Sequence, residues 1–104
     1  MMFQLALPMR PTLPDAMTQT VEFCRLLNRA LPTGAFSLDP SDAEVTFRAG
    51  HFYRPGSLHL ETFTTFFWYC IGAIEPALPG FTVITSGRAE AAGVAALMLN
   101  PDSN

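Results

Sequence analysis

The chain has 104 residues, a formal net charge of −3, and six arginines but no lysine. Binding to nucleic acid needs a basic face that neutralises several phosphates, and the scattered arginines provide none, so this class of partner is disfavoured. The absence of lysine also excludes Schiff-base chemistry and the lysine of a phosphate-binding P-loop.

The chain is rich in apolar residues for its size. They make up 49% of the sequence, whereas charged residues make up only 14%. A chain of this length forms one domain whose surface is large relative to its volume. We therefore expect a second copy or a protein partner to cover part of the apolar surface. The expected domain spans residues 1–99, and residues 100–104 are expected to form a loose tail.

The first expected elements are a strand and a helix. Apolar residues alternate over residues 3–7, which predicts a half-buried strand that ends at Pro8. Pro14 suits the first turn of a helix that Thr12 or Asp15 can cap. This helix is expected to end at Pro32, and its core-facing residues are expected to be Met17, Thr20, Cys24, Leu27 and Leu31.

A hairpin follows the helix. Apolar residues alternate over residues 35–39 and again over residues 44–49. Residues 39–42, Asp-Pro-Ser-Asp, have the composition of a turn. Three strands with one apolar face need a covering layer of helices, so the sequence predicts an α+β fold with a small antiparallel sheet packed against helices. The expected order of elements is β-α-β-β-α-α.

Residues 57–78 predict a long helix, with Ser57 as its N-cap. Its expected core-facing residues are Leu60, Phe63, Phe67, Cys70, Ile71 and Ile74. Trp68 and Tyr69 fall off that stripe, and an aromatic residue beside a polar face indicates a surface that meets another chain. The predicted partner or dimer interface consists of Glu61, Thr65, Trp68, Tyr69 and Gly72, together with Phe52 and Tyr53 of the preceding loop. For these two loop aromatics, contact with a partner and closure of the core remain equal alternatives.

The long helix is expected to stop before Pro79-Gly80. Residues 81–85 are β-prone, and the sequence leaves open whether they form a strand, an extended link or a helix. Ser86 can cap a last helix over residues 88–99. The run without charge or proline, residues 62–74, is shorter than the roughly 20 residues that span a membrane, so no membrane insertion is expected.

Candidate chemistry is sparse. His59-Leu60-Glu61 matches half of a zinc deaminase signature, but the paired cysteines of the other half are missing. Cys24, His51, His59 and Cys70 have no spacing typical of a metal site, and no cofactor is expected. Two buried thiols in the reducing cytoplasm explain the cysteines, whereas a Cys24–Cys70 disulfide would require an oxidising compartment.

Two stretches carry a resemblance to a known family. The first is residues 26–39, Leu-Leu-Asn-Arg-Ala-Leu-Pro-Thr-Gly-Ala-Phe-Ser-Leu-Asp, followed by Val-Thr-Phe-Arg at 45–48. The second runs from Pro76-Ala77-Leu78 through Val83-Ile84 and Gly87 to Glu90-Ala91. In order and spacing, these residues resemble the YbjN family of bacterial proteins, called sensory transduction regulators.

The resemblance implies a fold like that of type III secretion chaperones, often dimeric, with protein–protein contact as its mode of action. No catalytic residues are established for that family. Its domains usually carry a helix and further strands before the segment that matches residues 3–7, so this chain is either a short member or an incomplete domain. Its sheet would then have an exposed edge, which strengthens the expectation of a dimer.

Three hypotheses follow for the function. The leading one is a cytoplasmic, non-enzymatic homodimer that binds a protein partner in a chaperone-like or regulatory way. The alternative is a carrier of a small apolar ligand, with a pocket between the long helix and the sheet that Phe63, Phe66, Phe67 and Phe81 would line. An enzyme is the weakest hypothesis, because acid–base catalysis needs convergent polar groups and the chain offers few.

Overall fold

The structure is a computed structural model that describes residues 1–51, Gly56 and residues 59–99. Its elements are β1 (Met2–Ala6), α1 (Pro14–Ala30), β2 (Ala35–Asp39), β3 (Glu44–Gly50), α2 (Leu60–Ile74), the 3-10 turn η1 (Glu75–Ala77), α3 (Leu78–Thr85) and α4 (Ala91–Leu99). The predicted α+β fold is therefore confirmed. The predicted order also holds, because α2, η1 and α3 run on as one helix from Leu60 to Thr85.

The three strands form an antiparallel sheet in the order β1-β3-β2. In this register Phe47 of β3 lies between Leu5 of β1 and Phe36 of β2. The alternation read from the sequence is confirmed in β3, where Val45, Phe47 and Ala49 are buried and the residues between them are more exposed. The helices cover this apolar face, and the turn between β2 and β3 matches the predicted Asp39–Asp42 segment.

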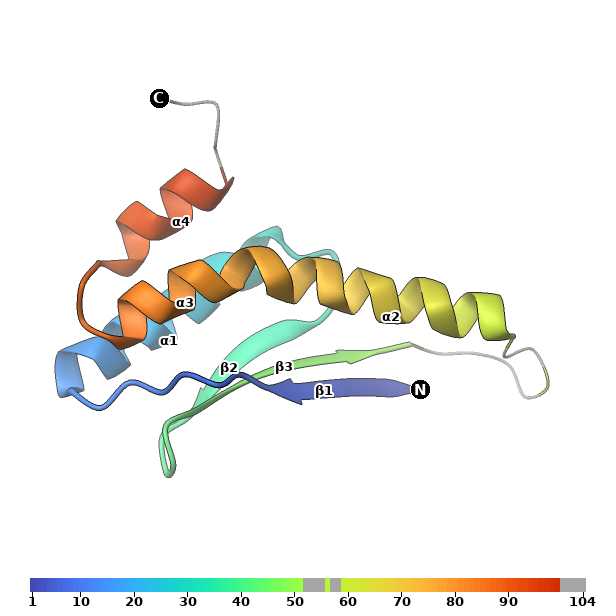
Figure 1. The fold of residues 1–104 in the computed structure, drawn as a ribbon, viewed down its shortest axis with the longest axis horizontal. Helices are drawn as coiled ribbons and strands as arrows, with labels where there is room; N and C mark the ends of the chain where they lie inside the picture. Colours follow the sequence, from blue (N-terminus) through green and yellow to red (C-terminus); the bar gives the residue numbers. More distant parts are fainter. Residues whose placement is uncertain (52–55, 57–58, 100–104) are drawn as a thin grey trace.

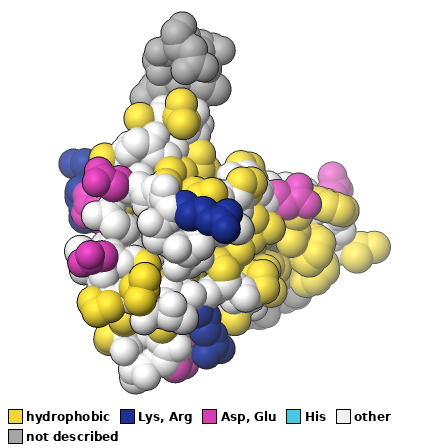
Figure 2. All heavy atoms as spheres, turned by 60° about the vertical axis from the view of Figure 1, so that its left-hand side comes forward, with side chains coloured by type: hydrophobic (Ala, Val, Ile, Leu, Met, Phe, Trp, Pro, Cys, Tyr) yellow, Lys and Arg dark blue, Asp and Glu magenta, His cyan; other side chains and the backbone are white. Residues whose placement is uncertain are grey.

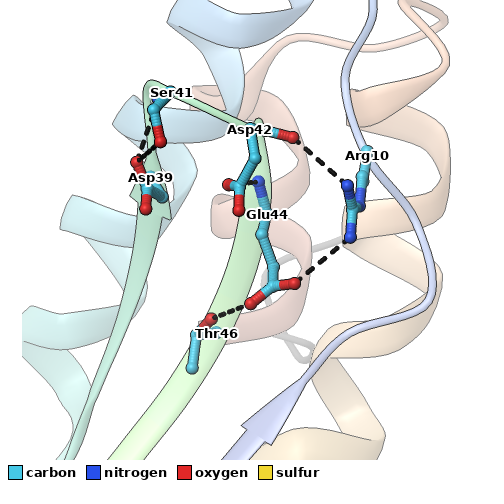
Figure 3. A network of polar contacts seen from close by, with 6 residues as sticks. All are labelled: Arg10, Asp39, Ser41, Asp42, Glu44 and Thr46. Atoms are coloured by element: carbon cyan, nitrogen blue, oxygen red, sulfur yellow. Dashed lines mark hydrogen bonds and ion pairs between the residues drawn. The ribbon is translucent and has the colours of Figure 1, made fainter.

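The β2–β3 turn is held by polar contacts, which Figure 3 shows. Asp39 accepts hydrogen bonds from the backbone and the hydroxyl of Ser41, and these bonds lower the pKa of the Asp39 carboxyl. Arg10, which follows β1, forms an ion pair of 3.2 Å with Glu44 at the start of β3. The turn is thereby tied to the chain segment that leads from β1 into α1.

The core lies where α1, the sheet and α3 meet. Phe81 of α3 is fully buried, with its ring centroid 4.8 Å from Phe23 of α1 and 5.2 Å from Phe36 of β2. Gly80 allows α3 to approach α1 this closely, because a Cβ atom there would lie 2.6 Å from Phe23 Cζ. Phe23 is not among the residues of α1 expected to face the core, yet the structure places it at the centre of the core.

The expected stop of the long helix at Pro79-Gly80 is wrong. Pro76 and Pro79 each lie in the first turn of a new segment, η1 and α3, where a missing backbone N–H costs little. Residues 81–85 are therefore helical. Their β-prone composition is overridden by packing, since Phe81, Ile84 and Thr85 are all buried, and the Thr85 hydroxyl donates to the Phe81 carbonyl at 2.7 Å.

The predicted helix caps also need correction. The N-cap of α1 is Leu13, and neither Thr12 nor Asp15 supplies a side-chain cap to that described helix start. The last helix begins at Ala91, and its N–H donates to Gln19 Oε1 of α1 at 2.7 Å. Ser86 instead donates its hydroxyl proton to the Val83 carbonyl at the end of α3. Ser57, the expected cap of α2, and the tail at 100–104 lie outside the described residues.

The molecule is thin, with extents of 47 × 37 × 18 Å. Figure 1 looks down the shortest axis and shows β1 and α2 on the near side, with β2 and α1 behind them. The near broad face therefore consists of the outer edge of β1 and one flank of α2. Figure 1 also shows that the first turns of α2 extend past the ends of β1 and β3.

Candidate protein-interaction surface

The N-terminal half of α2 leaves large apolar side chains exposed. Leu60 is 80% exposed and Trp68 is 62% exposed. Phe63 and Phe67 are less exposed, at 49% and 37%. The residues of α2 that are buried are Cys70 and Ile74, in its C-terminal half. The expectation that Leu60, Phe63 and Phe67 face the core is therefore wrong. Part of the reason is geometric, because the first turns of α2 extend past the ends of β1 and β3 (Figure 1), so no described strand lies beneath the start of the stripe.

The aromatic side chains among them contact one another, and these contacts reach β1. The rings of Phe63 and Phe67 are stacked, with centroids 6.4 Å apart, and Trp68 lies edge-on to Phe67 at 5.5 Å. Phe67 also meets Phe3 of β1 at 6.1 Å. We call this surface the apolar flank; it consists of Phe3, Leu5, Leu60, Phe63, Phe67 and Trp68. In Figure 2, hydrophobic side chains dominate the right-hand part, where this half of the molecule recedes from the viewer.

The interface residues expected from the sequence occupy different surroundings. Glu61, Thr65 and Gly72 are exposed, and Trp68 lies next to Phe67 at the border of the apolar flank. Tyr69 is half-buried, and its hydroxyl is used inside the fold: it donates to the Thr33 carbonyl at 2.7 Å and accepts from the Thr33 N–H at 3.3 Å. Phe52 and Tyr53 lie outside the described residues.

Sequence reasoning missed most of the apolar flank. The spacing of Leu60, Phe63 and Phe67 is the same whether the stripe meets a core or a second protein, so periodicity alone gave no signal. The low charge of the chain was the signal that some apolar surface stays exposed, but it did not say which.

A groove lies on the other side of α2, toward the end of β3. It has a volume of about 640 Å³ and is lined by Thr33, Gly50, His51, Glu61, Thr62, Thr65, Phe66 and Tyr69. His51 meets Phe66 edge-on at 5.5 Å. The aromatic pocket expected from the sequence is not formed, because Phe81 is packed in the core. Phe63, Phe66 and Phe67 line only a cavity of about 50 Å³ against the start of β1.

The cysteines are buried free thiols, as the sequence predicted. Burial raises the pKa of the Cys24 thiol to about 12 and also raises the pKa of Cys70, so neither is poised as a thiolate nucleophile. His59 is the N-cap residue of α2, and both His59 and Glu61 are exposed at the helix start. Within residues 1–51, 56 and 59–99, no three potential metal-binding side chains gather.

The continuous helix from Leu60 to Thr85 has 26 residues and is long and apolar enough to cross a membrane. The expectation that proline and glycine end it too early for a membrane span is therefore wrong. A third (33%) of its most apolar window is buried inside the protein, where the C-terminal half packs against α1 and the sheet. Length and composition alone do not separate a membrane span from a helix that packs on protein.

Comparisons with known proteins give no relative for this chain. No protein-family model, no curated protein and no solved structure matches it. The function therefore has to be argued from the residues and the surfaces described above.

Proposed function

We propose that the chain is a non-enzymatic protein–protein interaction module that acts as a homodimer, in a chaperone-like or regulatory role. The observation that carries the proposal is the apolar flank, where aromatic and aliphatic side chains of α2 and β1 form a continuous exposed surface. Large contiguous apolar surfaces on soluble proteins mark sites of association. The resemblance of residues 26–48 to YbjN proteins points to the same class of function.

The composition of the exposed half of α2 supports this proposal. It contains Thr62, Thr64 and Thr65 and a run of aromatic residues, which are all mediocre helix formers. Most helices in proteins depend on packing of an apolar face for their stability. A helix half with weak propensity and little packing within its own chain gains that packing when a second chain covers it.

The two free thiols fit the proposed cytoplasmic location, because reduced cysteines are typical of proteins in that compartment. The exposed aromatic residues also fit the chemistry of association. Tryptophan, tyrosine and phenylalanine are enriched in protein interfaces, and tryptophan often carries a large share of the binding free energy.

Replacement of Trp68 by alanine tests the proposal. Sedimentation equilibrium should show weaker self-association, and pull-downs from the native cell should lose partner protein. Leu97→Ala is the matched control, because Leu97 lies on α4 and is 62% exposed, as Trp68 is. Association that persists in the Trp68 variant but fails in the Leu97 variant would place the interface on α4 and contradict the proposal.

A carrier of a small apolar ligand is the second candidate, and the 640 Å³ groove beside Phe66 and Tyr69 favours it. A ligand that binds only the folded state raises the melting temperature with its concentration. A screen of apolar ligands by thermal shift therefore tests this function. A shift that Thr62→Trp removes, while dimer mass is unchanged, would assign the ligand to the groove.

A further inference from the structure

The backbone hydrogen bonds of β1 show which of its groups face outward. The Leu7 N–H donates to the Val45 carbonyl at 2.8 Å, and the His51 N–H donates to the Met1 carbonyl at 2.9 Å. Bonded and non-bonded positions alternate along an antiparallel ladder, so the odd-numbered residues of β1 bond to β3. The N–H and carbonyl groups of Met2, Gln4 and Ala6 therefore point away from β3, along the outer edge of the sheet.

The two edges of the sheet differ in protection. At the β2 edge, the side chain of Asn28 on α1 accepts from the Phe36 N–H at 2.7 Å and donates to the Phe36 carbonyl at 2.9 Å. No described strand pairs with the outer edge of β1. Its sequence, Met-Phe-Gln-Leu-Ala, also lacks the charged side chains and proline with which natural proteins discourage pairing at an edge.

We propose that the outer edge of β1 pairs with β1 of a second copy, in antiparallel register about a two-fold axis at Gln4. The pairing, which rests on the proposed homodimer and defines its mode, joins two sheets into one of six strands. All outward-facing backbone groups are then used, since Gln4 meets Gln4 of the second copy and Met2 meets its Ala6.

The side chains of β1 favour a second copy as the occupant. A residue on a two-fold axis meets itself, so a charge there would repel its own copy, whereas a glutamine amide both donates and accepts. On the helix-facing side, Phe3 lies opposite Leu5 of the second copy. Leu5 is 39% exposed in the single chain, and this aromatic–aliphatic contact covers it.

The shape of the molecule agrees with this arrangement. The near face in Figure 1 contains both the β1 edge and the flank of α2, so pairing of the strands brings the two α2 helices toward each other. Five residues of edge strand alone form a small interface, and the apolar flank extends it toward the roughly 800 Å² per partner of stable complexes. The two copies would lie side by side along the short axis, in which one chain is only 18 Å thick, so the dimer would be less flat than the single chain.

Disulfide trapping of full-length protein tests the register. Gln4→Cys places two thiols at paired positions whose Cα atoms lie about 5.5 Å apart, within the range of a disulfide. Met2→Cys is the matched control on the same exposed side of β1, and its two thiols would lie roughly 13 Å apart. After mild oxidation, we expect a covalent dimer for Gln4→Cys and no covalent dimer for Met2→Cys. The double variant Met2→Cys with Ala6→Cys should regain the dimer.

Equal trapping of Gln4→Cys and Met2→Cys, or no trapping of either, would overturn the proposal. The native thiols are buried, so they contribute little to trapping. Gln4→Pro gives an independent readout, because it removes an outward N–H while the ladder to β3 stays intact. We expect a folded monomer by circular dichroism and light scattering. A Gln4→Pro dimer of wild-type mass would reject edge pairing and leave the proposed homodimer standing, whereas a monomeric wild-type protein would reject both.

Discussion

Both halves of the long helix, which runs from Leu60 to Thr85, are apolar, but their environments are opposite. In the C-terminal half, Ile74, Phe81 and Ile84 are buried against α1 and the sheet. In the N-terminal half, Leu60, Phe63 and Trp68 are exposed, and the first turns of the helix extend past the ends of β1 and β3 (Figure 1). The same apolar periodicity therefore makes a core where other elements lie beneath it and leaves an open surface where they do not.

The two halves of the long helix should contribute to different properties, namely the stability of the single chain and its association with a second chain. Contacts in the C-terminal half hold the single chain together, so changes there should act on its free energy of unfolding. Contacts in the N-terminal half are available to a second chain, so changes there should act mainly on the dissociation constant of the dimer. Four tests, which use six substitutions in all, probe this separation.

We expect the largest difference in unfolding free energy between the variants Phe81→Ala and Phe67→Ala. Removal of the fully buried Phe81 ring leaves a cavity and should lower the free energy of unfolding by about 3–5 kcal/mol. Phe67 is more than a third exposed, so its loss should destabilise the chain less and weaken the dimer more. Urea unfolding of dilute protein and light scattering measure the two effects. A Phe67 variant as unstable as the Phe81 variant would show that both halves belong to one core.

Gly80→Ala against Gly72→Ala compares the two halves at matched positions within the helix. Alanine is favoured over glycine in a helix interior by about 1 kcal/mol. At Gly80 the new Cβ would lie 2.6 Å from the buried Phe23 ring. The cost of this overpacking should exceed the gain in helix propensity and lower the free energy of unfolding by about 1–3 kcal/mol. At Gly72 an added Cβ would meet no described atom within 4 Å apart from its own helix backbone and its chain neighbours, so the variant should be more stable. Thermal unfolding of both variants shows whether each substitution raises or lowers the melting temperature.

The Cys24 thiol provides a pH test of burial in the packed half. Burial raises its pKa from 9.0 to about 12, so above pH 9 the unfolded thiol ionises while the folded one stays protonated. Stability is therefore full below pH 9 and falls as the pH rises from 9 toward 12, by about 1.4 kcal/mol per pH unit from this group. Cys24→Ala should remove that part of the decline. An unchanged pH slope in this variant would mean that other groups cause the loss.

Tyr69→Phe has the smallest expected effect and marks the boundary between the halves. The substitution removes the two hydrogen bonds to Thr33 and should cost about 1 kcal/mol of unfolding free energy. Because this hydroxyl is engaged within the chain, dimer mass should not change. A loss of association without a loss of stability would instead place Tyr69 in the interface, as the sequence predicted.

Local patterns predicted the elements whose environment is local. The alternation of Val45, Phe47 and Ala49 identified a strand with one buried face, and the Asp39–Asp42 turn set the hairpin. The sequence also predicted the three-stranded antiparallel sheet, because three short apolar alternations need one common covering layer.

The sequence predictions are wrong where contacts between distant parts of the chain determine the local structure. Residues 81–85 are β-prone, yet burial of Phe81 and Ile84 keeps them helical. Pro79 predicts a helix stop, but after the turn η1 it lies at the start of the next helical segment, α3. The spacing of Leu60 and Phe63 predicts a core-facing stripe, because nothing in the spacing shows where the sheet ends. Of the apolar flank, the sequence thus predicts Trp68 at an interface, but it predicts neither the exposure of Leu60 and Phe63 nor the extension onto β1.

The solution mass of the purified wild-type protein, measured by light scattering over a concentration series, tests the central claim most directly. We predict a mass of twice the 11.4 kDa chain at high concentration, with dissociation only on dilution. A mass of one chain at every concentration would contradict the account, because the apolar flank would then remain open without a second copy.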